Sequence, residues 1–348
     1  MTPDNGGKAA PVASKSSSAD AKGPNRVLTG SRSTGMPHLG NYFGAYQPAI
    51  ALQDRYELFL FLADFHALNE GFTPAENRAN SLDLAASFLG CGLDPAKSLL
   101  YAQSAVPEVN ELAWILSCQV PYGVMARAHA FKDAQAKSID LNMGVFNYPI
   151  LMAADILLFD AKLVPVGQDQ KQHVEMTRDM AQRFNARFGD HIVVPEPLIS
   201  SDVAVVPGID GEKMSKSKAN TVPLFADDKT WKKQIMAIVT DTKGLDDPKD
   251  PDTCTVVKLY RLMATEAEVR EMSDKYRAGG YGYGHAKLAL LEKVKERFTP
   301  MRDRYLDLMK RPDDLRDIVL AGSKRARDIA RAKLEKIHAA IGLIGRPF

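Results

Sequence analysis

The first two thirds of the chain alternate short apolar runs with longer segments of helical period. Strands are predicted over four apolar runs, at 26–29, 58–63, 99–103 and about 163–166. Helices are predicted between them, over 40–54, 74–90 and 108–117. Apolar runs with little alternation are typical of strands buried on both faces of a parallel sheet. The pattern therefore predicts an α/β fold.

Beyond about residue 225 the strand signal fades, and helical periodicity continues almost to the end of the chain. Helices are predicted over 231–239, 265–277, 286–309 and 313–341, with a glycine-rich turn at 279–284. A chain of 348 residues has room for two domains at roughly 150 residues each. We expect a tail over 1–25, a parallel-sheet domain over 26–225 and an all-helical domain over 226–348.

The tail is rich in Gly, Pro, Ser, Ala and Lys, a composition that cannot offset the entropy of ordering it. We therefore predict that it is disordered. It has neither the apolar core of a secretory signal nor the arginine-rich amphipathic pattern of a transit peptide, so both are disfavoured. No apolar run reaches the ~18 residues that span a bilayer. The expected location is the cytoplasm.

Charge and cysteine content argue against binding of nucleic acid by overall charge and against sites built from cysteines. With 45 Lys and Arg against 43 Asp and Glu, the net charge of +2 gives no polycation, so a nucleic acid must meet a local patch. Cys91, Cys118 and Cys254 form no CxxC pair, which argues against disulfides and cysteine-ligated metals. We expect no metal site. A candidate patch for nucleic-acid phosphates lies near the C-terminus, although a solvated helix face is the alternative: Lys324, Arg325, Arg327, Arg331, Lys333, Lys336 and Arg346.

The first predicted strand runs into the turn TGSRSTGMPHLGN, residues 29–41, which opens a predicted helix. A glycine-rich turn at a helix N-terminus favours anions, because free backbone N–H groups and the helix dipole point at them. Met36 stands where a P-loop needs Gly-Lys, and the G-x-G-x-x-G pattern is absent, so both of those nucleotide motifs are excluded. His38 remains able to donate to a phosphate. Alone, it is more simply explained as a capping or core histidine.

A second motif, GEKMSKSK at 211–218, follows the sheet region. Lys213 and Lys216 provide two ammonium groups and Ser215 and Ser217 two hydroxyls, which suit the charge of a leaving pyrophosphate. Alone, the segment would be interpreted as a solvated loop. Together with the first turn, about 175 residues earlier, it makes coincidence a poor explanation.

The two motifs together resemble those of class I aminoacyl-tRNA synthetases, and specifically the bacterial-type members that use tryptophan. Residues 38–41 are similar to the family's His-Ile-Gly-His, with Asn41 at the second His, and 213–217 match its Lys-Met-Ser-Lys-Ser. Residues 148–158 and 164–175 are similar to its amino-acid pocket helix and nucleotide turn. The resemblance covers nearly everything from residue 26 onward.

The resemblance implies a Rossmann-like catalytic domain that activates L-tryptophan with ATP and Mg²⁺, and a helical domain that reads the anticodon of tRNA(Trp). It also implies a homodimer. His38, Lys213 and Lys216 are the implied catalytic residues. ATP contacts are implied for three segments: Arg32, Ser33, Thr34, Gly40 and Asn41; Gly167, Gln168, Asp169 and Val205; and Lys213, Met214, Ser215, Lys216 and Ser217.

The predicted pocket helix offers chemistry that suits an indole ring. Tyr148, Met152 and Asp155 share one helix face, and Pro149 fits a first turn. Met152 can lie against a flat ring, and Asp155 can accept an indole N–H. An aspartate among so many apolar neighbours should be buried only with a partner, although a surface or capping role is the alternative. By resemblance, further tryptophan contacts come from Gln170 and His66, with Leu28, Val164 and Val166 shaping the pocket.

The first turn departs from the family, because Arg32-Ser33 stands where many members have Gln-Pro. Arg32 still suits a phosphate. Lys132 and Lys137 are further candidates for phosphate or substrate, with a solvated helix as the alternative. Three other functions remain open: a tyrosyl-tRNA synthetase, for whose extra C-terminal domain the chain has no room; an idle RNA-binding paralogue; and a small-molecule nucleotidylyltransferase.

Overall fold

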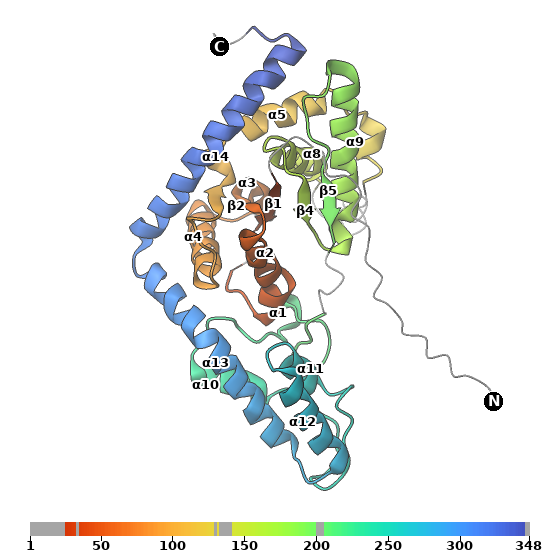
Figure 1. Cartoon of the computed structure of the whole chain (residues 1–348), viewed down its shortest axis with the longest axis vertical. Helices are drawn as coiled ribbons and strands as arrows, with labels where there is room; N and C mark the ends of the chain where they lie inside the picture. The colour runs from red at the N-terminus through yellow and green to blue at the C-terminus, as the bar shows by residue number, and fades with distance from the viewer. Residues whose placement is uncertain (1–24, 33–34, 129–130, 132–140, 200–204, 345–348) are drawn as a thin grey trace, which may run out of the picture.

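A computed structural model describes residues 25–32, 35–128, 131, 141–199 and 205–344. It shows a lobe built on a sheet and a second lobe made of helices, with two long helices, α13 and α14, running along one side (Figure 1). This arrangement confirms the expected α/β fold class with a parallel sheet and a helical C-terminal part. None of the helices in these ranges is long and apolar enough to cross a lipid bilayer.

The sheet has five parallel strands in the order β3-β2-β1-β4-β5. Their bounds are β1 Arg26–Ser31, β2 Glu57–Leu62, β3 Leu99–Ala102, β4 Leu163–Pro165 and β5 Glu196–Leu198. The four predicted strands are confirmed, and β5 was missed. Its three residues form no apolar run and include Pro197. A proline is tolerated in an edge strand because the outer side of that strand pairs with no neighbour and needs no N–H donor.

The predicted helices are confirmed to within a few residues. Those of the sheet lobe are α1 Leu39–Asn41, α2 Gln47–Ala51, α3 Asp64–Ala67, α4 Pro74–Gly90, α5 Glu108–Ser117, α6 Tyr122–Met125, α8 Met143–Leu157 and α9 Lys171–Phe188. Those that follow are α10 Asp228–Met236, α11 Thr255–Arg261, α12 Glu266–Ala278, α13 Tyr283–Met309 and α14 Pro312–Ile341. Helices α3, α6, α9 and α11 were missed. The segment expected as one helix over 40–54 is interrupted by a π-helical stretch at Tyr42–Tyr46.

The two faces of the sheet belong to different cores. Side chains alternate along β1 and β2, so that Val27 and Leu58 pack in one cluster and Leu28 and Phe59 in the other. The first cluster continues into the helical lobe through residues such as Trp231, which is fully buried. One of the two cores therefore joins the sheet to the helical lobe.

Helix α14 covers the edge strand β3. A Cβ atom on Gly322 would lie 1.9 Å from the carbonyl oxygen of Leu100, so only glycine permits this approach. Ser323 Oγ accepts a hydrogen bond from the Ala102 N–H at 3.1 Å, which satisfies a donor of the edge. The domain division at residue 225 stays a prediction, since this last helix packs on the sheet lobe.

Candidate active site

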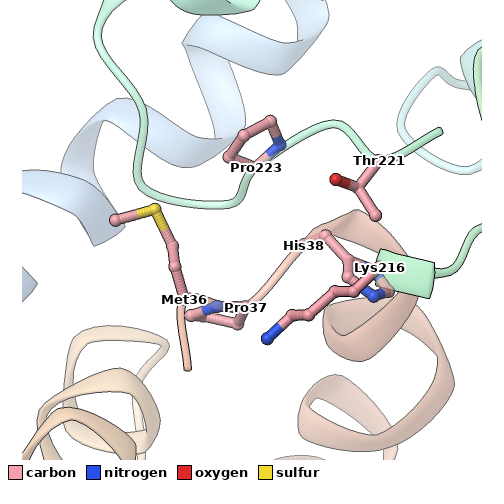
Figure 2. Close-up of a pocket in the computed structure, with 6 residues that line it drawn as sticks. All are labelled: Met36, Pro37, His38, Lys216, Thr221 and Pro223. Atoms are coloured by element: carbon pink, nitrogen blue, oxygen red, sulfur yellow. The ribbon is translucent and has the colours of Figure 1, made fainter. Parts of the chain in front are cut away.

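The two sequence motifs meet at one cavity of about 300 Å³. The first turn contributes Met36, Pro37 and His38, and the segment after the second motif contributes Thr221 and Pro223, with Lys216 beside them (Figure 2). Backbone hydrogen bonds hold the segments together: Leu39 N–H donates to Val222 at 3.0 Å, and Leu224 N–H donates to Pro37 at 2.8 Å. The meeting of motifs so distant in sequence supports the prediction that they act as one site.

His38 is positioned by the start of the helical segment that follows it. The Asn41 side-chain oxygen accepts a hydrogen bond from the His38 N–H at 3.0 Å, and the His38 side chain is buried. Its Nδ1 has no hydrogen-bond partner among the described residues. Burial, and then the charge of Lys216, lowers the pKa of His38 to about 4. The ring is therefore neutral near pH 7 and offers a neutral N–H donor at the cavity.

Lys216 reaches across to the first turn. Its Nζ donates to the carbonyl oxygen of Gly35 at 2.9 Å, and Figure 2 shows its side chain passing His38. Burial lowers the pKa of Lys216, while the nearby carboxylate of Asp83 opposes that shift. Met214 is buried, and its sulfur accepts a hydrogen bond from the Gly40 N–H at 3.3 Å. The second motif is thus fastened onto the helix start through Met214.

The lowered pKa of His38 can be tested by NMR titration. We expect the imidazole NMR signals of His38 to shift with a midpoint near pH 4, because burial disfavours the charged ring. The unfolded chain takes up the proton near pH 6.5, so this residue lowers stability as the pH falls from about 6.5 to about 4. In Lys216→Ala the midpoint should move upward. A wild-type midpoint at or above 6.5 would contradict the account.

Asp155 lies at the centre of a second group of buried polar side chains. It is 1% exposed, and the Gln103 amide Nε2 donates to both of its carboxylate oxygens at 2.9 Å. His66 Nε2 lies 3.0 Å from Oδ2 of the same carboxylate. Burial raises the pKa of Asp155, while the bonds from His66 and Gln103 oppose the shift. The expectation of a buried aspartate with a partner is confirmed.

Gln103 was not predicted as a site residue. Its Oε1 accepts hydrogen bonds from the N–H groups of Phe65 at 3.1 Å and His66 at 3.4 Å, while its amide nitrogen binds Asp155. One side chain thus orients both the carboxylate and the segment that carries its histidine partner. A polar residue at the end of the third predicted strand was the available signal, because ligands bind at the carboxyl ends of parallel strands.

The remaining pocket residues lie on or beside α8. Tyr148 Oη forms a hydrogen bond with His173 Nε2 at 2.9 Å, and Met152 is partly buried against the core. The placement of Pro149 in a first turn was wrong. Helix α8 begins at Met143, where Asn142 accepts a hydrogen bond from the Val145 N–H, so the proline lies inside the helix. The earlier cap extends the helix past the point where a proline normally starts one.

Of the predicted residues that the structure describes, His38 and Lys216 line the cavity and the others do not. Arg32 forms an ion pair with Glu70 at 2.7 Å, Lys213 is exposed, and Val205 is largely exposed. Hydroxyls of Ser215 and Ser217 lie 2.9 Å apart. The turn after β4 holds Gly167, Gln168 and Gln170; Leu28 and Val164 are buried core residues, and Val166 is half-buried. Outside the described residues lie Ser33, Thr34, Lys132, Lys137 and the side chain of Asp169.

Among the described residues, no three His, Cys, Asp or Glu side chains come together as they would around a metal ion. The donors at the cavity are instead an imidazole and an ammonium group. An ammonium group cannot ligate a metal, and Mg²⁺ prefers oxygen ligands to an imidazole nitrogen, so this pair suits an anionic ligand and not direct coordination of Mg²⁺.

Comparison with known proteins gives a family match over most of the chain. Residues 20–299 match the family described as tRNA synthetases class I (W and Y). A tryptophan–tRNA ligase of Campylobacter jejuni is 46% identical over 318 residues, covering 91% of this chain and 100% of the relative. One of Fusobacterium nucleatum is 47% identical over 322 residues, covering 92% and 98%. The crystal structure of Campylobacter jejuni tryptophanyl-tRNA synthetase with ADP and tryptophan superposes with a TM-score of 0.87 at 46% identity, over 91% of this chain and 100% of that one.

Proposed function

The chain belongs to the class I tRNA synthetases of the W and Y type, and we propose that it activates L-tryptophan with ATP and transfers it to tRNA(Trp). The observation that carries the proposal is the meeting of His38 and Lys216 on one cavity. The identity of 46–47% to tryptophan–tRNA ligases supports tryptophan over tyrosine as the amino acid. It also supports an active enzyme over an idle paralogue.

In the first step an oxygen of the tryptophan carboxylate attacks the α-phosphorus of ATP. The new P–O bond forms as the bond to pyrophosphate breaks, and pyrophosphate leaves with the electron pair. The nucleophile is the substrate's own carboxylate. The contribution of the protein is therefore to position the substrates and to stabilise the phosphoryl charge. We assign that stabilisation to the neutral ring of His38 and the ammonium groups of Lys213 and Lys216. Mg²⁺ is expected to arrive with the ATP phosphates as part of the substrate.

The second group of polar residues supports the choice of amino acid. The Asp155 carboxylate, held by Gln103 and His66, is a buried acceptor for the indole N–H, which is a donor only. A phenol can also donate, so discrimination against tyrosine depends on shape and on where this carboxylate points. Tyr148 and Gln170 are assigned to the substrate's ammonium group, and Met152 to the face of the ring.

In the second step a hydroxyl of the terminal ribose of tRNA attacks the activated carbonyl carbon, and AMP leaves. The helical lobe is assigned to anticodon recognition. Part of the basic C-terminal face holds α14 in place, because Arg327 bonds Glu108 at 3.0 Å and Lys333 bonds Asp160. The exposed Lys324, Arg325 and Lys336 are therefore assigned to tRNA phosphates.

A homodimer is part of the proposal. Three large apolar side chains on α5, α6 and α8 are strongly exposed: Trp114 at 72%, Tyr122 at 74% and Met143 at 67%. The ring of Tyr122 stacks on Phe146 of α8, which places α6 beside the start of that helix. Exposed apolar groups on adjoining elements mark an association surface, and a second copy of the chain is the proposed occupant. We propose a cytoplasmic location, because protein synthesis there would use the aminoacylated tRNA.

The proposal is tested by ATP–pyrophosphate exchange, measured with each amino acid in turn. We expect exchange that depends on tryptophan and is negligible with tyrosine. Exchange with tyrosine and not with tryptophan would mean that the protein is a tyrosyl-tRNA synthetase. Absence of exchange with every amino acid would favour the idle RNA-binding paralogue.

A further inference from the structure

Asn220 lies buried directly behind the second motif. Residues 206–214 form a hairpin in which Met214 N–H donates to Val206 at 2.9 Å and Gly208 N–H donates to Glu212 at 2.7 Å. Asn220 is 2% exposed and packs against this hairpin at Gly208, where an added Cβ would lie 2.4 Å from its Cγ atom. The hairpin therefore leaves a space that the asparagine side chain fills.

The carboxamide of Asn220 makes three hydrogen bonds to the loop. Its oxygen accepts from the Ser215 N–H at 2.7 Å, and its nitrogen donates to the Lys213 carbonyl at 3.1 Å. The nitrogen also donates to Oδ1 of Asp210 at 2.8 Å. The first two bonds fix the peptide groups on either side of Met214. One is the peptide group between Lys213 and Met214, and the other is the peptide group between Met214 and Ser215, the residue before Lys216.

The backbone beside Asn220 is strained. Ala219 has a φ of 51°, in the left-handed region that residues with a Cβ adopt rarely. Its N–H donates to the Lys216 carbonyl at 3.0 Å, so the strained residue closes the short helical turn that carries Lys216. Such conformations persist only where the surroundings determine them, and they gather at functional sites. Asn220 follows Ala219 directly and binds the N–H of Ser215, the residue before the turn, so it connects the two ends of the turn.

We propose that Asn220 is a positioning residue for adenylate formation, which holds the segment 213–216 so that Lys216 faces the cavity it shares with His38. The inference rests on the proposed function. Asn220 reaches the reaction only through the peptide groups it binds. Its loss should therefore lower the rate of the chemical step while leaving tryptophan binding at Asp155 intact.

The test measures tryptophan-dependent exchange in four variants of the full chain. In Asn220→Ala, kcat should fall by about 10²-fold, the scale expected when catalytic groups are displaced by about 1 Å. In Asn220→Asp a carboxylate would face that of Asp210, and the fall should be larger. In the double variant Asp210→Asn/Asn220→Asp an amide donor faces the new carboxylate again, so kcat should recover at least tenfold over Asn220→Asp.

Asn185→Ala is the matched control. Asn185 binds the backbone of a loop in the same way as Asn220, at a place outside the cavity. Its side chain accepts hydrogen bonds from the His191 and Ile192 N–H groups and donates one to the Ile192 carbonyl. This variant should keep the wild-type kcat even if it lowers the melting temperature. Tryptophan affinity, measured by equilibrium dialysis, should stay within about twofold of wild type in all four variants.

Three results would overturn the inference. These are a kcat within twofold of wild type in Asn220→Ala, a loss of tryptophan affinity that parallels the loss of rate, and a double variant no faster than Asn220→Asp. If Asn220→Ala does not fold, the comparison of Asn220→Asp with the double variant decides the question. Absence of exchange in the wild-type protein would instead refute the proposed function, so the two failures are distinguishable.

Discussion

Replacing Lys216 by alanine is expected to slow tryptophan-dependent ATP–pyrophosphate exchange by about 10²–10³-fold, the scale of losing one preorganised group that stabilises developing charge. Lys216 donates to the carbonyl of Gly35 and lines the cavity beside His38, so its ammonium group is already placed at the predicted phosphate site. The measurement is steady-state exchange at saturating tryptophan. Most of the effect should appear in kcat, because the charge it stabilises develops during the step.

Lys218→Ala provides the matched control. Lys218 ends the same helical turn and lies 3.9 Å from the carboxylate of Glu212, with its side chain about half exposed. Removing it takes the same charge from the same turn without touching the cavity. Its rate should remain within about threefold of wild type. Equal losses in the two variants would mean that general charge, and not the position of Lys216, governs the reaction.

The second large effect is expected for tryptophan binding in Asp155→Asn. The change keeps the size of the side chain but removes the charged acceptor, and a hydrogen bond to a charged group contributes about 1.5–3 kcal/mol. Affinity should therefore fall by about 10–100-fold, measured by equilibrium dialysis or tryptophan fluorescence. The asparagine N–H₂ also meets the donors of Gln103 and His66, which adds to the loss.

ATP affinity supplies the internal control for this variant, because the cavity beside His38 should be unaltered. Asp179→Asn, an exposed carboxylate on the neighbouring helix α9, is the matched substitution and should leave tryptophan affinity unchanged. Unaltered tryptophan affinity in Asp155→Asn would mean that this carboxylate is not the partner of the indole N–H. A parallel loss of ATP binding would indicate damage to the fold.

Local signals in the sequence predicted most of the fold. The helix over Pro74–Gly90 begins with Thr73 and Glu76 in a capping box and has a proline in its first turn, so its start is encoded within a few residues. The apolar run at 58–63 predicted strand β2, which lies inside the sheet between β3 and β1 and is buried on both faces. Strand β5 and helix α11 carry no such pattern, since packing and not local composition fixes them.

The site residues also fall into a group that the sequence predicted and a group that it did not. The residues of the two motifs were predictable because they form recognisable sequence patterns: His38 in the turn after the first strand, and Lys213 and Lys216 in the segment after the sheet region. Gln103 and Asn220 were not, because the sequence does not show which buried group each amide will face. Their importance comes from partners 52 residues away in one case and 5 in the other, and only the fold brings those partners into contact.

Transfer of labelled tryptophan to tRNA(Trp) by the wild-type protein tests the central claim most directly. We expect acid-precipitable tryptophan on the tRNA that requires ATP, with no attachment when tyrosine replaces tryptophan. We also expect that Lys216→Ala slows the overall reaction while Lys218→Ala does not. Attachment of tyrosine, or no attachment of tryptophan under conditions where the protein is folded, would contradict the proposed function.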